Sequence, residues 1–425
     1  MRCVDNINNK ESNMGKVYKR NNCRLCGSTD FEHVLNLTPT PPADSYVSVK
    51  QLAKVQEVYP IDLFLCRNCG VTQLLDVIDT EEVYLNYTYL TISSLGLVKH
   101  FEKYADEVME QIKPAPGQLV IDIGSNDGTL LKFFKKHGMK VLGIDPAPSI
   151  AKIATEAGIT TLSEFFTEEY ARELRKEYGT AAIITSNNLV ADVDNLMDMI
   201  KGVRELLAPD GVFMFESFYF LDQVKNLVWD FTYHEHFSSF TVKPLKAFFC
   251  KLGMELFDAQ RIDTKGGSMR FKVQLKGGPH KVSPIINEHI KIEEESGIHK
   301  PEVFIQYKSR IEKVKRDLTE LLEDLKAKGK TFAGFGASAT STTLIYHYEL
   351  GHTIDFIVDD FTAKQNLFSP GYHIPVYHPD EIYNRKPDYI IILAWRYYEP
   401  IMKKHQRYLD EGGHFIIPLP EVKVI

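Results

Sequence analysis

A chain of 425 residues is long enough for two or three domains. Its 44% hydrophobic and 25% charged residues are typical of a globular protein, and a net charge of −7 argues against nucleic-acid binding, which needs a basic face. No apolar run reaches about 18 residues, and the polar residues 1–20 are expected to form a disordered tail without a signal segment, so the sequence predicts a cytoplasmic protein with no membrane span.

Two Cys-x-x-Cys pairs mark residues 21–80. Cys23 and Cys26 form the first pair, Cys66 and Cys69 the second, and a glycine directly follows each pair. Four thiolates in two such pairs fit tetrahedral coordination of Zn²⁺. We therefore expect a structural zinc domain with a proline-rich insert between the pairs, the alternatives being two redox pairs or unrelated thiols.

Residues 81–283 alternate between strand and helix. Buried strands are expected at 118–124, 140–146, 181–187 and 211–217, with amphipathic helices at 128–138, 148–158 and 196–211. The segments "GMELFDAQRID" and "GSMRFKVQL" are expected to close the sheet as an antiparallel pair. This order predicts an α/β domain with a doubly wound, mainly parallel sheet.

The turn "DIGSNDG" follows the first of these strands and opens a helix. The candidate cofactor-binding residues are Asp122, Gly124, Asn126 and Gly128 in this turn, with Asp145 at the end of the next strand and Asn188 directly after the strand at 181–187. Asn126 replaces the middle glycine of the dinucleotide fingerprint, and a carboxylate at Asp145 can accept both ribose hydroxyls. The pattern favours S-adenosylmethionine (SAM), the alternatives being a dinucleotide enzyme or a domain that binds neither.

Residues 284–425 begin with a charged helical linker and then alternate again. "GFGASATS" follows a strand and opens a helix, so residues 336–340 are expected to present backbone N–H groups and hydroxyls, among them those of Ser338 and Thr340, to a phosphate. A second, smaller Rossmann-like domain is predicted. Two nucleotide-like pockets suggest that both reactants carry a nucleoside.

"WDFTYHEHFSSF" places four polar side chains in a row, Tyr233 to His236, among aromatic residues. On a strand, His234 and His236 would face the same way and could bind a metal. A structural polar strand and an acid–base site are the other two interpretations. No third metal ligand is close in sequence, which argues against a metal site, and the other two interpretations stay open at this point.

These motifs, together with "YLNYTYLTISSLGLVKH", "KGGSMR" and "LAW", resemble the nucleotide-sugar C-methyltransferases that use SAM to methylate C3 of a TDP-4-keto-deoxyhexose. The resemblance extends from residue 22 over nearly the whole chain. It implies three parts: an N-terminal zinc domain, a central SAM-binding domain and a C-terminal Rossmann-like domain. The TDP-sugar would lie between them, and the oligomeric state stays open, a monomer being compatible.

The resemblance also implies roles for individual residues. The four cysteines match the zinc ligands, Gly124 and Asp145 match the SAM pocket, and His236 matches the base. Other matching residues would face the sugar or form the rest of the pocket: Tyr233, Glu235, His234, either Tyr87 or Tyr89, Ser338, Thr340 and Trp395. Two positions depart from the family, which commonly has His where this chain has Asp192 and Lys265.

The expected reaction starts from the acidity that a C4 ketone gives to the C3 proton. A base with a pKa near working pH removes that proton, and donors stabilise the enolate oxygen. Methyl transfer to another atom of the sugar nucleotide, an NAD-dependent sugar-nucleotide oxidoreductase, and a zinc-ribbon binding module with inactive Rossmann domains remain as alternatives.

Overall fold

The computed structural model describes residues 17–78, 90–93 and 96–425. Most of the expected tail, and both Tyr87 and Tyr89, lie outside the described residues. The prediction of a tail is wrong for its last part, because Tyr18–Lys19 (β1) pairs antiparallel with Asp76–Val77 (β5). In the described part of the chain, no helix combines the length and the apolar character that a membrane span requires.

The N-terminal sheet has four antiparallel strands in the order β11-β4-β3-β2. Its strands are β2 (Phe31–Leu35), β3 (Leu63–Cys66), β4 (Thr72–Leu74) and β11 (Ser238–Ser239). The last strand comes from the segment expected to belong wholly to the central domain. Ser238 pairs with Gln73 of β4, so the segment that carries Tyr233 to His236 is joined to the sheet next to the Cys-x-x-Cys pairs.

The central sheet has seven strands in the order β12-β13-β10-β9-β6-β7-β8. They are β6 (Leu119–Ile123), β7 (Lys140–Ile144), β8 (Thr161–Leu162), β9 (Ala181–Asn187), β10 (Leu207–Phe218), β12 (Met254–Ile262) and β13 (Ser268–Leu275). The first five are parallel, and β12 and β13 form the antiparallel pair that the sequence predicts. Strand order reverses between β6 and β9, which is where open α/β sheets bind ligands.

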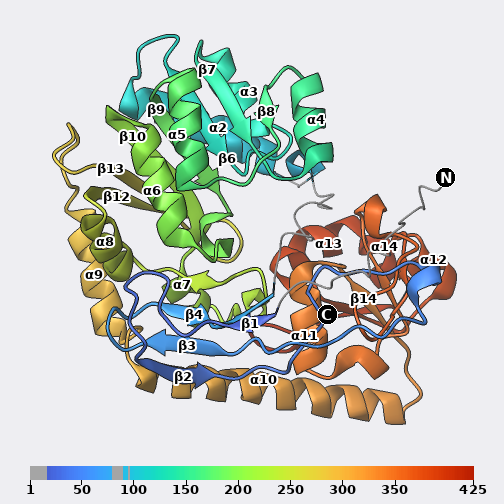
Figure 1. Cartoon of the computed structure of the whole chain (residues 1–425). Helices are drawn as coiled ribbons and strands as arrows, with labels where there is room; N and C mark the ends of the chain where they lie inside the picture. Colours follow the sequence, from blue (N-terminus) through green and yellow to red (C-terminus); the bar gives the residue numbers. More distant parts are fainter. Residues whose placement is uncertain (1–16, 79–89, 94–95) are drawn as a thin grey trace, which may run out of the picture.

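Helices cover both faces of the central sheet (Figure 1). They are α2 (Leu97–Ile112), α3 (Thr129–Lys136), α4 (Pro148–Glu156), α5 (Glu168–Tyr178), α6 (Leu196–Leu206), α7 (Phe220–Lys225) and α8 (Val242–Lys251). Because both faces are covered, strands such as β6 are buried along their whole length. The rings of Phe215 and Phe271 stack at 4.8 Å in the core beneath β10 and β13.

Two helices, α9 (Ile285–Ser296) and α10 (Pro301–Ala327), lead to the C-terminal sheet. Pro301 is at the start of α10, where its missing N–H leaves no hydrogen bond unmade. Figure 1 shows this long helix passing along the N-terminal sheet and the C-terminal helices. Lys308 of α10 donates to Asn36 at 2.6 Å, and Tyr348 donates to the Ile311 carbonyl at 3.2 Å, so α10 contacts both regions.

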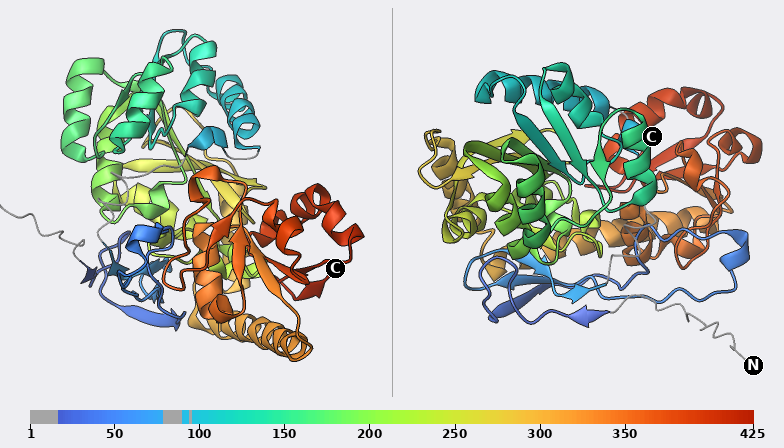
Figure 2. Two further views of the ribbon diagram at one scale, coloured as in Figure 1. Left: turned by 90° about the vertical axis from the view of Figure 1, so that its right-hand side faces the viewer. Right: turned by 45° about the horizontal axis from the view of Figure 1, so that its top comes forward.

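The C-terminal sheet has six strands in the order β16-β15-β14-β17-β18-β19, all parallel except the last. Its strands are β14 (Phe332–Phe335), β15 (Phe356–Val358), β16 (Val376–Tyr377), β17 (Tyr389–Ile392), β18 (His414–Ile417) and β19 (Lys423–Val424). Its helices are α11 (Ala339–His347), α12 (Glu381–Arg385), α13 (Tyr398–Lys404) and α14 (Gln406–Asp410). The two views of Figure 2 show the N-terminal, central and C-terminal parts as three bodies in contact.

Candidate active site

The turn between β6 and α3 has the backbone that its small residues predict. Gly124, Asn126 and Gly128 all adopt left-handed φ values, of 74°, 50° and 72°. A Cβ on Gly124 would come within 2.9 Å of Leu189, so this position has room only for glycine. The Asn126 N–H donates to Asp145 at 2.9 Å, and the Asn126 side-chain oxygen accepts from the Thr91 N–H at 2.8 Å.

Two carboxylates, those of Asp122 and Asp145, lie next to this turn. Asp122, at the end of β6, accepts a 2.6 Å hydrogen bond from Thr185, and burial raises its pKa to about 7. Asp145 accepts from the N–H groups of Asn126 and Ala147, so part of its capacity holds the turn itself. Asn188, with φ of 55°, follows β9 across the switch point, and its N–H donates to the Glu216 carbonyl at 2.8 Å.

Tyr233 to His236 form a turn and not a strand. The segment begins with a short helix, η4 (Trp229–Phe231), and the His236 N–H donates to the Tyr233 carbonyl at 2.9 Å. The two histidines therefore do not face the same way. His236 Nδ1 contacts the Phe231 carbonyl at 2.7 Å, whereas His234 Nε2 contacts the Tyr59 carbonyl at 3.1 Å.

His236 lies in an aromatic enclosure. Its ring centroid is 4.0 Å from that of Tyr233 and 4.9 Å from that of Phe218. Burial lowers its pKa to about 3, so the ring is neutral at physiological pH, and the hydrogen bond to Phe231 keeps the proton on Nδ1. Nε2 is left as the acceptor, 3.9 Å from Oδ1 of Asp192.

Asp192 and Lys265, the two departures from the family pattern, meet at this histidine. Asp192 ends the short helix η3 (Val190–Asp192), and burial raises its pKa well above the usual range, with Glu235 raising it further. Lys265 has a left-handed φ of 52° in the turn between β12 and β13. Burial lowers its pKa, while the charge of Asp192 raises it.

Glu235 and His234 have different surroundings. Burial raises the pKa of Glu235 to about 7; the nearby Asp44 also raises it, and Lys364 lowers it. The His234 side chain is 2% exposed, and burial lowers its pKa to about 4. Because its Nε2 is used by the N-terminal part, His234 does not join Tyr233, Glu235 and His236 in one group.

The glycine-rich turn of the C-terminal sheet is largely closed by its own hydrogen bonds. The N–H groups of Gly336, Ala337 and Ser338 donate to Val358, Asp359 and Ser341. The prediction that residues 336–340 offer their N–H groups to a phosphate is therefore wrong for these three. An acidic side chain, Asp359, occupies the position where an anion would bind.

The three C-terminal candidate residues are also engaged. Ser338 begins α11, and its hydroxyl lies 3.0 Å from that of Thr340. Thr340 accepts from Arg396 at 3.2 Å. The Trp395 indole is 6% exposed, and its N–H donates to Asp230 at 2.9 Å, so it has no further donor for a substrate.

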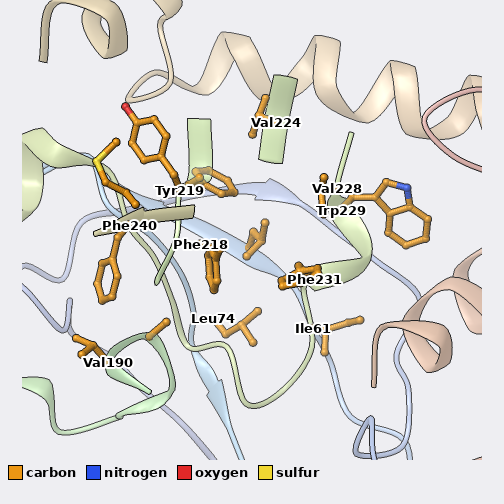
Figure 3. Close-up of a cluster of buried hydrophobic side chains, with 14 of the residues drawn as sticks. Ile61, Leu74, Val190, Phe218, Tyr219, Val224, Val228, Trp229, Phe231 and Phe240 are labelled. Atoms are coloured by element: carbon orange, nitrogen blue, oxygen red, sulfur yellow. The ribbon is translucent and has the colours of Figure 1, made fainter. Parts of the chain in front are cut away.

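Sequence reasoning missed Asp230 and Arg396, which lie 166 residues apart and meet at 2.9 Å. No local signal links them, although Asp230 lies inside "WDFTYHEHFSSF" and Arg396 directly follows "LAW". It also missed the pair of His100 and Glu216, whose side chains meet at 2.7 Å at the carboxyl end of β10. The Val190, Phe218 and Phe231 side chains of the site belong to one buried cluster with Ile61 and Leu74 of the N-terminal part (Figure 3).

The four cysteines come together as predicted. Within residues 17–78, 90–93 and 96–425 they are the one group of three or more side chains placed to share a metal ion, with all four sulfurs within 4.8 Å of one another. Cys23 and Cys69 lie 3.6 Å apart, as do Cys26 and Cys66. A tetrahedral zinc with Zn–S bonds of about 2.3 Å needs sulfurs about 3.8 Å apart, so the residues fit Zn²⁺.

Comparison with known proteins agrees with this arrangement. Three family models match in succession: "Putative zinc binding domain" at residues 23–84, "Methyltransferase domain" at 98–258 and "C-methyltransferase C-terminal domain" at 263–420. The chain is 32% identical to C-methyltransferase NovU of Streptomyces niveus over 404 residues, which cover 95% of this chain and 96% of that protein.

Two more distant similarities cover less than half of the chain. The chain is 28% identical over 122 residues to a ubiquinone biosynthesis O-methyltransferase of Actinobacillus pleuropneumoniae, covering 26% of this chain and 50% of that protein. A magnesium protoporphyrin IX methyltransferase of Synechocystis PCC 6803, solved with bound SAH, matches 43% of this chain and 84% of its own at 14% identity, with a TM-score of 0.34.

A central methyltransferase fold beside a four-cysteine zinc domain defines a SAM-dependent methyltransferase with a structural zinc. The match over nearly the whole length of both chains narrows the class. The protein belongs to the C-methyltransferase family that includes NovU. The oxidoreductase, the inactive binding module and methyl transfer to oxygen or nitrogen are thereby set aside.

Proposed function

We propose that the enzyme methylates C3 of a TDP-4-keto-6-deoxyhexose and that His236 is the base that removes the C3 proton. The observation that carries this proposal is the fixed imidazole: Nδ1 is held by the Phe231 carbonyl, and Nε2 is left with its lone pair beside Asp192. A carbon acid needs a base that is positioned at its proton, and Nε2 is the free acceptor of this imidazole.

Asp192 supplies the second half of the chemistry. A carboxyl group whose pKa is raised by burial keeps its proton near neutral pH and can donate to the C4 oxygen. As Nε2 of His236 takes the C3 proton, the electrons of the C3–H bond move toward that oxygen, and Asp192 donates its proton there. Imidazolium and carboxylate then form an ion pair across the 3.9 Å gap, which offsets the cost of charging either group alone.

The remaining step uses the C3 carbon of the enol. SAM supplies a methyl group already activated on sulfonium and leaves as the thioether. The new C3–CH₃ bond forms as the C4 ketone returns and its proton goes back to Asp192, and His236 then releases the C3 proton to solvent. The protein needs only to hold the two reactants in line. Lys265 adds a positive charge beside the developing oxyanion.

The other site residues take supporting roles in this proposal. Tyr233 and Glu235 face the sugar, and either Tyr87 or Tyr89 joins them. His234, Ser338, Thr340 and Trp395 hold the surrounding loops, since each has a side-chain polar atom that contacts the protein. The SAM pocket is formed by Asp122, Gly124, Asn126, Gly128, Asp145 and Asn188.

We also retain the domain division at 21–80, 81–283 and 284–425. Strand β11 of the second segment completes the sheet of the first.

The direct test incubates the enzyme with SAM and TDP-4-keto-6-deoxyglucose and locates the new methyl group by NMR. His236→Ala is expected to lower turnover by about 10²–10⁴-fold, the usual contribution of a general base. SAM affinity, measured by calorimetry, should not change. Turnover by this variant at the wild-type rate would rule out His236 as the base, and a methyl group on another atom would rule out the C3 assignment.

Asp192 is tested with a pair of substitutions in the same assay. Asp192→Asn keeps an N–H donor for the C4 oxygen, and Asp192→Ala keeps none. If the residue acts as a neutral donor, the Asn variant retains more activity, with the Ala variant about 10²–10³-fold below the wild type. Equal loss in both variants would show instead that Asp192 must accept a proton.

A further inference from the structure

We propose that Asp230 is a positioning residue for His236, acting from the boundary with the C-terminal part through the backbone of Phe231. The proposal deepens the proposed function and rests on His236 being the base. Asp230 itself is fully buried, and both its carboxylate oxygens are bound by Trp395 and Arg396, so it is not expected to contact the substrate.

The Asp230 carboxylate is held by two side chains of one short helix, η7 (Trp395–Tyr397). The Trp395 indole N–H donates to Oδ2 at 2.9 Å. The Arg396 guanidinium donates to both oxygens, at 3.1 and 2.9 Å. A buried carboxylate bound by a cation and a neutral donor is rigid, and removal of its charge leaves Arg396 without its partner.

The two residues after Asp230 are held from the same side. The Arg396 guanidinium lies over the Phe231 ring, 4.4 Å from its centroid. The Thr343 hydroxyl of α11 donates to the Thr232 carbonyl at 3.1 Å. Three consecutive residues, 230 to 232, thus depend on η7 and α11.

The Phe231 carbonyl connects the residues held by η7 and α11 to His236, the proposed base. It accepts the Nδ1 proton of His236 at 2.7 Å and so fixes both the tautomer and the direction of Nε2 toward Asp192. A displacement of about 1 Å in a reacting group costs about 10²-fold in rate. Without the contacts that hold residues 230–232, the Phe231 carbonyl is expected to shift by about this distance and to displace the His236 ring with it.

The test follows proton removal alone. Wild type and Asp230→Asn are placed in D₂O with TDP-4-keto-6-deoxyglucose and no SAM, and loss of the C3 proton signal is followed by NMR. The variant is expected to exchange this proton about 10²-fold more slowly. Its affinity for SAM should equal that of the wild type, because the central switch point is built from other residues.

Two controls separate positioning from a general loss of stability. Glu293→Gln changes another fully buried carboxylate, which accepts from the Tyr219 hydroxyl at 2.7 Å and the Val242 N–H at 2.6 Å and lies outside the loop. It is expected to lose stability but exchange the proton at the wild-type rate. Asp230→Asn combined with His236→Ala should be no slower than His236→Ala alone, since a residue that acts through His236 has nothing left to position.

Three results overturn the proposal: wild-type exchange by Asp230→Asn, an equal loss in Glu293→Gln, or additive losses in the double variant. If Asp230→Asn does not fold, two further variants each remove one donor: Thr343→Val keeps the side-chain shape, and Trp395→Phe keeps an aromatic ring of smaller size. Smaller losses are expected, and wild-type exchange in both overturns the proposal. Failure of the wild type itself to exchange the proton is a different result, which counts against the proposed function.

Discussion

At the scale of single residues, burial in the candidate site shifts the pKa values of acids and bases in opposite directions. Burial disfavours charge, so it lowers the pKa of His236 and raises those of Asp192 and Glu235. The site therefore favours a neutral imidazole beside carboxyl groups that hold their protons more tightly than usual. Such a set can accept a proton at one atom and donate one at another without first building up charge.

The raised pKa of Glu235 predicts how stability depends on pH. Its value moves from 4.5 to about 7, so the native state binds this proton more tightly than the unfolded chain does. The resulting stabilisation is complete below pH 4.5 and is lost as the pH rises through 7. Glu235→Gln cannot titrate, and it is expected to lose less stability than the wild type between pH 5 and 8, as measured by urea midpoints without ligands.

The matched control for this experiment is Glu323→Gln, on the exposed side of α10. Its stability should follow the wild-type pH dependence. If the Glu235→Gln curve also runs parallel to that of the wild type, ionisation of Glu235 is not linked to folding.

At the scale of elements, the segment from η4 to β11 takes its structure from its neighbours. Alternating polarity in "YHEHFSSF" is compatible with a long strand, but only Ser238–Ser239 pair with β4. The preceding residues turn because His234 bonds to the Tyr59 carbonyl and Asp230 to η7. The helix α10, in contrast, is determined by its own sequence, because its hydrophobic period and its initial proline favour a helix. Once formed, it packs against both the N-terminal and the C-terminal parts.

The role of α10 as a support predicts a contrast between two isoleucines on it. Ile311 is fully buried, whereas Ile305 is 71% exposed. Ile311→Ala leaves a cavity and is expected to lower the free energy of unfolding by about 2–5 kcal/mol. Ile305→Ala, its matched control, should change it by no more than about 0.5 kcal/mol. Urea titrations followed by circular dichroism measure both, and equal effects would contradict the packing seen for this helix.

At the scale of the whole molecule, elements of all three parts contact the segment 229–239. The N-terminal part reaches it through β11 and through Arg24, which lies beside Cys23 and pairs with Asp194 at 2.7 Å, two residues from Asp192. The C-terminal part reaches it through η7 and α11. The central part supplies the switch point between β6 and β9.

This arrangement predicts the effect of removing zinc. Gln73 on β4 donates to the Cys23 sulfur at 3.2 Å, and the Leu74 N–H donates to the Phe237 carbonyl at 2.9 Å. Chelation is therefore expected to remove one zinc ion per chain and to speed amide exchange in residues 234–240. Affinity for SAM should remain, because the central sheet does not depend on the cysteines.

Elemental analysis, hydrogen exchange followed by mass spectrometry, and calorimetry measure these three quantities. Cys26→Ser should reproduce the effect of chelation, while Cys250→Ser, which changes an exposed free cysteine outside the cluster, should not. If amide exchange in residues 234–240 does not change after complete loss of zinc, the zinc-bound Cys-x-x-Cys pairs do not stabilise this segment.

The sequence by itself determined the features that depend on neighbours along the chain. Period and capping residues place α3, α4 and α10, small residues with left-handed φ place the turn after β6, and the Cys-x-x-Cys pairs place the metal ligands. The resemblance carried by the motifs led to the family, which the comparison with NovU confirms. Each of these signals lies within a few residues or in an order of motifs.

The tertiary structure alone decided which side chains face one another. His234 and His236 are two residues apart, yet one contacts Tyr59 and the other lies beside Asp192. Asp230 meets Trp395 across 165 residues, and β11 joins a sheet whose other strands end at residue 74. The physical reason is that direction and pairing depend on buried partners, and the chain brings those partners together only when its separate sheets pack.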